Sequence, residues 1–158
     1  LISEAAAVLE TAKKYGMMVG TGHLGPEEGM ALVRAGAELG CQIILTHADN
    51  PANAYTIQEQ CEAAELGAIV EHCYFTTYYR RTPIETITAQ IRAVGIEHVI
   101  LSTDFGQPQS PYSDEGLEQY ATLLARQGFS DAELRAMFCS TPARLLGMDV
   151  ADKGKTFR

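Results

Sequence analysis

The chain has 158 residues, which is enough for one domain with a buried core. Its formal net charge of −8 argues against a nucleic-acid backbone or an anionic membrane surface as a partner. No stretch approaches the ~18 uninterrupted apolar residues of a membrane span. Its four cysteines include no CxxC pair, so we expect reduced thiols and a cytoplasmic protein rather than a disulfide framework.

Apolar periodicity predicts helices that alternate with short strands along the chain. Glycines follow most of the helices, as expected for helix C-termini, and prolines stand at or near several helix starts. The expected helices cover residues 3–15, 26–39, 56–66, 83–94, 114–126, 130–138 and 141–146. The expected strands cover residues 17–22, 42–46, 68–75 and 98–103.

The strands read as continuous apolar runs, which is typical of parallel strands buried on both faces. Four consecutive strand–helix units, followed by a helical cap, make up residues 1–148, and a polar tail follows at 149–158. A complete eightfold barrel needs about 250 residues. The sequence therefore predicts an α/β fold that forms half of a (β/α)8 TIM-like barrel, with an open flavodoxin-like sheet as the alternative.

Polar residues stand where the strands end. His23, His47 and His72 each follow an apolar run, and Asp104 follows the run His98–Thr103. The carboxyl ends of parallel strands share one rim, where α/β proteins collect ligands and catalytic groups. Imidazole and carboxylate groups suit Zn²⁺ and related divalent ions. We therefore predict a metal site from His23, His47 and Asp104, with Asp104 also taking a proton from a metal-activated water.

In the expected strand 68–75, the sequence does not decide which side chain faces the barrel interior, because neighbours on a strand point to opposite faces. Either Glu71 or His72 faces the barrel interior, and we expect His72 to contact the substrate. Asp49 is either a turn residue or a partner that orients His47.

The following loop is aromatic and basic in an acidic protein. In it, Tyr78, Arg80 and Arg81 are predicted to bind an anionic group of a small-molecule substrate, with solvated loop charges as the alternative.

Four motifs together resemble the amidohydrolase superfamily: Thr21-Gly22-His23, Leu45-Thr46-His47, the run LSTDFG at 101–106, and the run TPARLLG at 141–147. The resemblance covers the C-terminal half of the family's barrel, strands five to eight. It implies that His23 and His47 are the metal ligands that end strands five and six, and that Asp104 is the aspartate of strand eight. It also implies a metal-dependent hydrolase that uses Zn²⁺, with Mn²⁺ or Fe²⁺ as alternatives.

The family's His-x-His pair on the first strand is not in this sequence, and the chain begins at Leu1, in or beside a helix. We therefore expect a piece of a longer protein, completed by an N-terminal half-barrel or by a second copy of this chain. Two other functions stay open. One is a catalytically inert half-barrel scaffold, and the other is a metal-dependent decarboxylase of the same superfamily.

Overall fold

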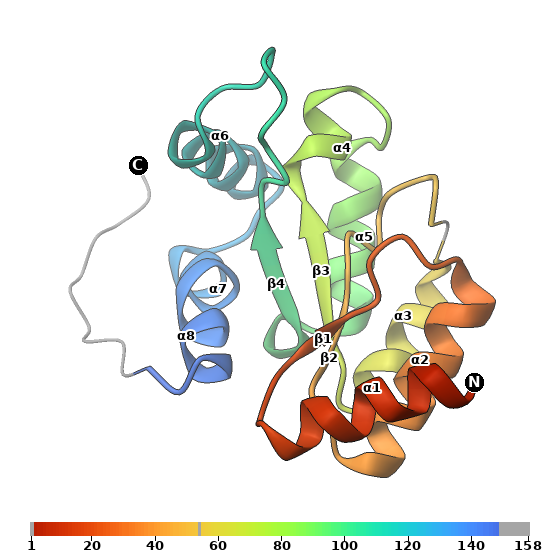
Figure 1. The fold of residues 1–158 in the computed structure, drawn as a ribbon. Coiled ribbons are helices and arrows are strands. Elements are labelled where there is room, and N and C mark those ends of the chain that lie inside the picture. Colours follow the sequence, from red (N-terminus) through yellow and green to blue (C-terminus); the bar gives the residue numbers. More distant parts are fainter. Residues whose placement is uncertain (1, 54, 149–158) are drawn as a thin grey trace.

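The computed structural model describes residues 2–53 and 55–148, so the predicted polar tail lies outside the described residues. Four parallel strands form one sheet in the order β1-β2-β3-β4 (Figure 1). They are β1 (Val19–Gly20), β2 (Ile43–Leu45), β3 (Ile69–Cys73) and β4 (Val99–Ser102). The sequential order confirms the predicted half-barrel, since a flavodoxin-like sheet places its second strand outside the first.

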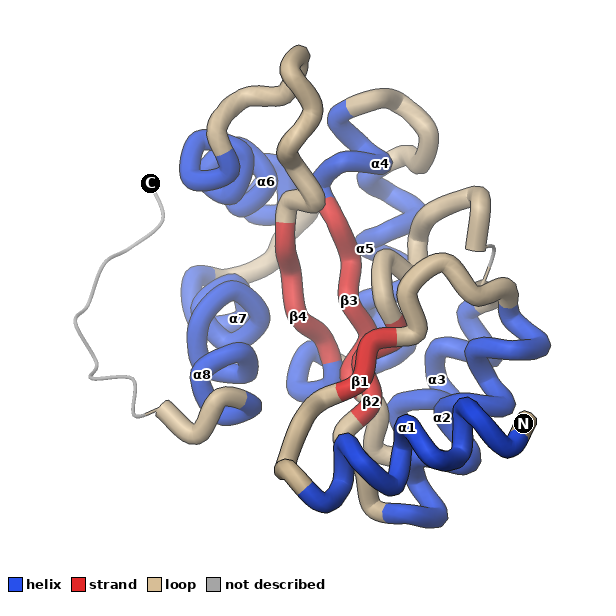
Figure 2. The backbone as a smooth tube through the Cα atoms, viewed as in Figure 1, coloured by secondary structure: helices blue, strands red, loops and turns tan. Residues whose placement is uncertain are grey.

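Helices precede, separate and follow the strands, as the sequence predicts (Figure 2). The longer ones are α1 (Ser3–Lys14), α2 (Pro26–Leu39), α3 (Ile57–Glu65), α5 (Ile84–Val94) and α6 (Ser113–Arg126). The C-terminal cap consists of α7 (Asp131–Arg135), a π-helical turn η2 (Ala136–Ser140) and α8 (Thr141–Leu145). In Figure 1 this cap lies beside β4, on the side away from β3.

Local side-chain chemistry explains where several helices begin and end. Ser130 and Glu133 form the predicted capping box at the start of α7, and Thr56 forms another with Glu59 at the start of α3. Gly40 ends α2 in the left-handed conformation, with φ 70°. These caps satisfy backbone groups that would otherwise lack partners at the helix termini.

Two short helical elements differ from the sequence prediction. The turn α4 (Tyr74–Tyr78) forms where the sequence predicts the end of a strand and a loop. Thr76 is buried there, and its hydroxyl oxygen lies 3.1 Å from the Cys73 carbonyl oxygen, where the chain bends directly after β3. A 3₁₀ turn, η1 (Ile96–His98), places His98 before β4, at the amino end of the sheet.

One face of the sheet packs against the helices and carries the main core. Its strand residues alternate along each strand and are almost fully buried: Ile43, Leu45, Val70, Val99 and Leu101. They meet apolar residues of the surrounding helices, including Val33, Ala63, Ile91 and Leu124. Burying this face supplies the main driving force for folding.

The opposite face corresponds to the interior of a closed barrel. Ile69 and Cys73 in β3 are buried there, but Ile44, Ile100 and Ser102 are only partly buried. Among the described residues, no helix is both long enough and apolar enough to cross a membrane.

Candidate functional site

Two threonines tie the end of β1 to the end of β2. The Thr46 amide donates to Thr21 Oγ1 at 3.0 Å, and the Gly22 amide donates to Thr46 Oγ1 at 3.2 Å. Gly22 has φ 57°, a left-handed conformation that glycine adopts without strain. Because these reciprocal bonds hold the strand ends together, the two histidines that follow them leave the sheet side by side.

The structure brings His23 and His47 into contact. Their ring centroids are 4.6 Å apart, with the ring planes tilted by 49°. His23 is exposed, whereas His47 is only 4% exposed, and its Nδ1 has no hydrogen-bond partner among the described residues. A buried polar atom without a partner is costly, so this nitrogen is suited to receive a ligand. The pair therefore offers two of the donors that a divalent metal ion uses.

Asn53 and Tyr55 hold the loop that carries His23. The Asn53 amide group donates to the carbonyls of Gly22 and Leu24, both at 3.1 Å, and the Tyr55 hydroxyl donates to Leu24 at 2.9 Å. Burial raises the pKa of the Tyr55 hydroxyl. Sequence reasoning missed both residues, and their only signal was their place in the loop that follows His47.

Asp104 lies at the other end of the sheet from the two histidines. It follows β4, and its side chain is exposed. Among residues 2–53 and 55–148, no group of three or more His, Cys, Asp and Glu side chains is arranged to hold a metal ion. The structure thus pairs His23 with His47 but does not bring Asp104 to them. The two imidazoles fit part of a metal site, one ligand short of the three that catalytic zinc sites take from the protein.

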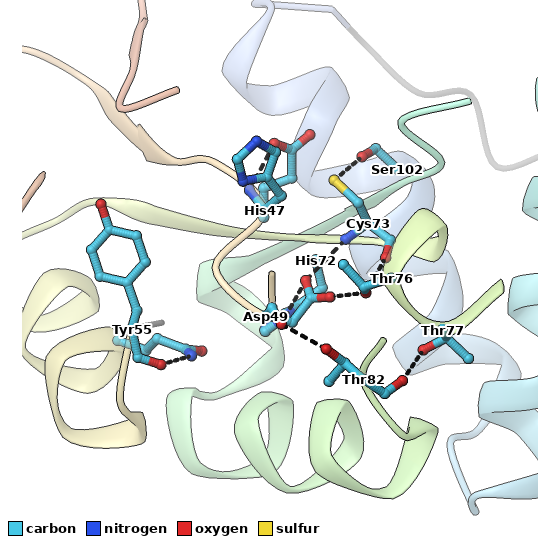
Figure 3. Close-up of polar contacts among 11 residues, drawn as sticks. His47, Asp49, Tyr55, His72, Cys73, Thr76, Thr77, Thr82 and Ser102 are labelled. Carbon is cyan, nitrogen blue, oxygen red and sulfur yellow. Dashed lines mark hydrogen bonds and ion pairs between the residues drawn. The ribbon is translucent and has the colours of Figure 1, made fainter. Parts of the chain in front are cut away.

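The structure settles which residue of β3 faces the interior. Glu71 lies on the inner face, where its carboxylate accepts from the His47 amide at 3.4 Å. His72 points the other way, is 0% exposed, and its Nδ1 lies 3.2 Å from Asp49 Oδ1. Figure 3 shows the His72 and Asp49 side chains meeting below the end of the sheet. His72 is therefore not brought to the rim, and Asp49 contacts His72 rather than orienting the His47 ring.

The interior face also carries a thiol beside a hydroxyl. Cys73 Sγ lies 3.1 Å from Ser102 Oγ, a contact visible in Figure 3. Burial, followed by the nearby charge of Glu71, raises the pKa of the Cys73 thiol. A thiol held protonated in this way is a poor nucleophile, so we assign Cys73 to packing rather than to chemistry.

The aromatic and basic loop lies beside Asp104. The Phe75 amide donates to the Thr103 carbonyl at 3.0 Å, and Tyr78 packs edge-on against Phe105 with centroids 5.1 Å apart. The Arg81 guanidinium lies over the Phe75 ring, 4.9 Å from its centroid. Arg80 and Arg81 are exposed, and among the described residues neither forms an ion pair with a carboxylate.

Three residues of the described chain other than glycine have a positive φ: His47 at 34°, Arg80 at 56° and Asp104 at 53°. All three are among the site residues that the sequence predicts. Such backbone is uncommon outside glycine, although His and Asp adopt it more readily than most residues, and it concentrates at functional sites. The rim of the sheet is therefore the strained part of the described structure.

Solved amidohydrolase structures share the fold of this chain. An amidohydrolase from Burkholderia multivorans matches with a TM-score of 0.67 and 18% identity, over 94% of this chain and 59% of its own. A putative 2-pyrone-4,6-dicarboxylic acid hydrolase from Pseudomonas putida matches with a TM-score of 0.64 and 18% identity, over 96% and 61%. The chain has the fold of half an amidohydrolase barrel.

A third structure, an organophosphorus hydrolase from Deinococcus radiodurans, matches this half-barrel with a TM-score of 0.65 and 17% identity. The match covers 89% of this chain and 49% of the organophosphorus hydrolase. The half-barrel thus spans about half to three fifths of these structures. By sequence, residues 1–71 match a family of unknown function, DUF6282. Among curated proteins there is no match to the sequence.

Proposed function

We propose that this half-barrel is the metal-binding part of a hydrolase that acts on a small molecule, and that it works in the cytoplasm with its cysteines reduced. The contact between His23 and His47, with the buried and unpartnered Nδ1 of His47, carries the proposal. Two imidazoles at neighbouring strand ends are the donors that Zn²⁺ prefers, with Mn²⁺ and Fe²⁺ as alternatives. When bound, such an ion would activate water to attack a C–N or C–O bond.

The other rim residues have separate roles in this proposal. Asp104, exposed at the end of β4 and not brought to the two histidines in this structure, takes the proton released by the attacking water at a carboxylate oxygen once the other half of the barrel is in place. Arg80 and Arg81, with Tyr78 beside them, bind an anionic group of the substrate through charge-assisted hydrogen bonds. His72 has no role in contacting substrate, because it is fully buried.

The remaining metal ligands and the missing half of the barrel come from a partner in this proposal. Between α1 and β1 lies an apolar groove of about 350 Å³, lined by residues that include Val8, Met17 and Met18. The amides of Val19 and Thr21 donate to the carbonyls of Gln42 and Ile44, at and beside β2, which leaves the other edge of β1 without a strand among the described residues. We propose that a strand and helix from the other half of the barrel dock here, rather than from a second copy of this chain.

Zn²⁺ titration tests the metal assignment. The double variant His23→Ala/His47→Ala is expected to bind Zn²⁺ at least about tenfold more weakly than the unchanged chain, because each imidazole supplies a ligand. His98→Ala is the matched control, since His98 lies at the opposite end of β4. Calorimetric titration and elemental analysis after dialysis provide the readouts. Equal Zn²⁺ affinity in the double variant would contradict the proposal.

The inert scaffold remains a second candidate, because the described residues do not assemble a three-ligand site. The scaffold predicts that supplying the other half of the barrel leaves Zn²⁺ affinity unchanged. The hydrolase predicts that it raises Zn²⁺ affinity, and that the increase disappears in the double histidine variant.

A further inference from the structure

Asp49 is the centre of a buried polar cluster that sits below the rim. The residue is 6% exposed, and its Oδ1 accepts from the Cys73 amide at 3.2 Å and from His72 Nδ1 at 3.2 Å. Its Oδ2 accepts from the Thr76 hydroxyl. Figure 3 shows these groups converging on one carboxylate from β3 and α4. A buried carboxylate needs such donors, and removing it would leave each of them without its acceptor.

The backbone of the same residue holds the arginine loop. The Thr82 hydroxyl donates to the Asp49 carbonyl at 2.9 Å. The loop is closed on itself, because the amides of Arg81 and Thr82 both donate to the Thr76 carbonyl, at 2.7 and 3.2 Å. Thr76 and Thr82 therefore both contact Asp49, and Arg81 lies in the short segment between them.

Asp49 lies in the same loop as His47, two residues later. The loop after β2 is held by the Ala48 amide, which donates to the Glu71 carbonyl at 2.9 Å, and by the Asn50 amide, which donates to His47 at 2.9 Å. Within this loop His47 keeps φ 34°, a conformation that persists only where the surroundings impose it. The side-chain bonds of Asp49 to β3 and α4 hold the same loop, two residues after His47.

From these contacts we infer that Asp49 is a positioning residue, which sets His47 and the Arg80–Arg81 segment relative to each other through two separable connections. Its carboxylate ties the loop of His47 to β3 and to Thr76, and so reaches both sides of the rim, whereas its carbonyl reaches only the arginine side through Thr82. His72 serves the same purpose by orienting the carboxylate. This inference deepens the proposed function and rests on it where it concerns ligand binding.

The two connections can be cut one at a time. Thr82→Val removes the hydroxyl that bonds the Asp49 carbonyl and keeps the shape of the side chain, whereas Thr82→Ser keeps the hydroxyl. Thr82→Val is expected to weaken binding of inorganic phosphate about fivefold, the equivalent of one hydrogen bond, and to leave Zn²⁺ affinity unchanged. Thr82→Ser should restore phosphate binding. Asp49→Asn should weaken binding of both probes.

A remote variant separates positioning from stability. Ser130→Ala removes the capping box of α7 and lowers the melting temperature without touching the rim. It should leave the affinities for phosphate and Zn²⁺ unchanged. If Thr82→Val and Asp49→Asn lower the melting temperature as Ser130→Ala does, and also leave both affinities unchanged, Asp49 is only structural and the inference is overturned.

Amide NMR shifts make the test independent of the proposed function. In the protein without added ligand, Asp49→Asn should shift the amide signals of His47 and Arg81, Thr82→Val those of Arg81 but not of His47, and Ser130→Ala neither. If the unchanged chain bound neither phosphate nor Zn²⁺, the proposed function would be wrong. The amide shifts would still decide whether Asp49 is a positioning residue. If neither Asp49→Asn nor Thr82→Val moves these amide signals, the positioning role of Asp49 is overturned.

Discussion

The two faces of the sheet differ in how completely they are covered. On the helix-facing side the exposure is 2% at Ile43, 0% at Leu45 and 0% at Val99. On the interior side Ile44 and Ile100, which follow these residues directly in the same strands, are only partly buried. The polar residues on the interior side are Thr46, Glu71 and Ser102.

This difference separates folding from function along single strands. Because side chains alternate between the faces, each strand gives one set of residues to the core and the next set to the interior. The helices of this chain bury the helix-facing side almost completely, whereas part of the apolar surface on the interior side stays exposed. Stability therefore depends mainly on one face, and the candidate chemistry depends on the other face and its rim.

Two alanine variants in β2 test this difference between the faces, and they have the largest expected effect on the free energy of unfolding. Leu45→Ala should lower the free energy of unfolding by about 3 kcal/mol, because it leaves a cavity in the closed core. Ile44→Ala should lower it by only about 1 kcal/mol, because its side chain is partly in water already. Urea unfolding followed by circular dichroism measures both. Equal losses would show that the interior face is as closed as the helix-facing one.

Two glycines sharpen the comparison at a smaller scale. A Cβ on Gly36 would meet Ile43 Cγ1 at 2.4 Å and Cδ1 at 2.6 Å, inside the packed layer between α2 and β2. Gly36→Ala should therefore cost about 1 kcal/mol net, since overpacking exceeds the helix propensity that alanine adds.

A Cβ on Gly20 would meet Thr46 Oγ1 at 2.9 Å, the atom that accepts from the Gly22 amide. Gly20→Ala should cost about 0.5 kcal/mol, because Thr46 has to move and weakens that one hydrogen bond. Thermal unfolding of the two variants distinguishes them, and a larger loss at Gly20 would contradict the comparison.

The smallest effect concerns the outer edge of the helix layer. The guanidinium of Arg92 in α5 pairs with Glu133 in α7, and this hydrogen bond above all lowers the pKa of the Glu133 carboxyl from 4.5 to about 2. A lowered pKa in the folded state means that the contribution is complete above pH 4.5 and is lost as the pH falls toward 2. At pH 7 it should be under about 1 kcal/mol, because the pair is partly exposed.

Glu133→Gln keeps an acceptor for the capping box and removes the charge. Its free energy of unfolding should lie below that of the unchanged chain at pH 7 and approach it near pH 2. Urea unfolding at several pH values measures the difference. A gap that does not change with pH would show that the charge contributes nothing.

Local sequence signals were sufficient for most of the fold. Apolar runs, helix-ending glycines and the Ser130 capping box depend on neighbouring residues, and the structure confirms the elements they predict. The turn α4 was missed because it depends on burial of Thr76 against the distant Asp49, which no local pattern shows. The closeness of His23 and His47 could be expected from strand ends that share a rim.

The direction in which site side chains point, and the distances between them, were harder to predict. The choice between Glu71 and His72 depends on which face β3 presents to the helices, and the register of a strand cannot be read from its own few residues. The hydrogen bond of Asp49 to His72 joins residues that are far apart in sequence. The separation of Asp104 from the histidines depends on the curvature of the sheet, which spacing does not specify.

The left-handed backbone at the rim bears on any attempt to engineer this protein. Selection for heat resistance alone would favour glycine at the exposed positions Arg80 and Asp104, because glycine adopts positive φ without strain, and less so at His47, which is buried. The evolved chain would be sturdier and would have lost the side chains that its rim presents. A durable variant that still binds its ligands should therefore be sought by changing the helix layer and leaving those three positions alone.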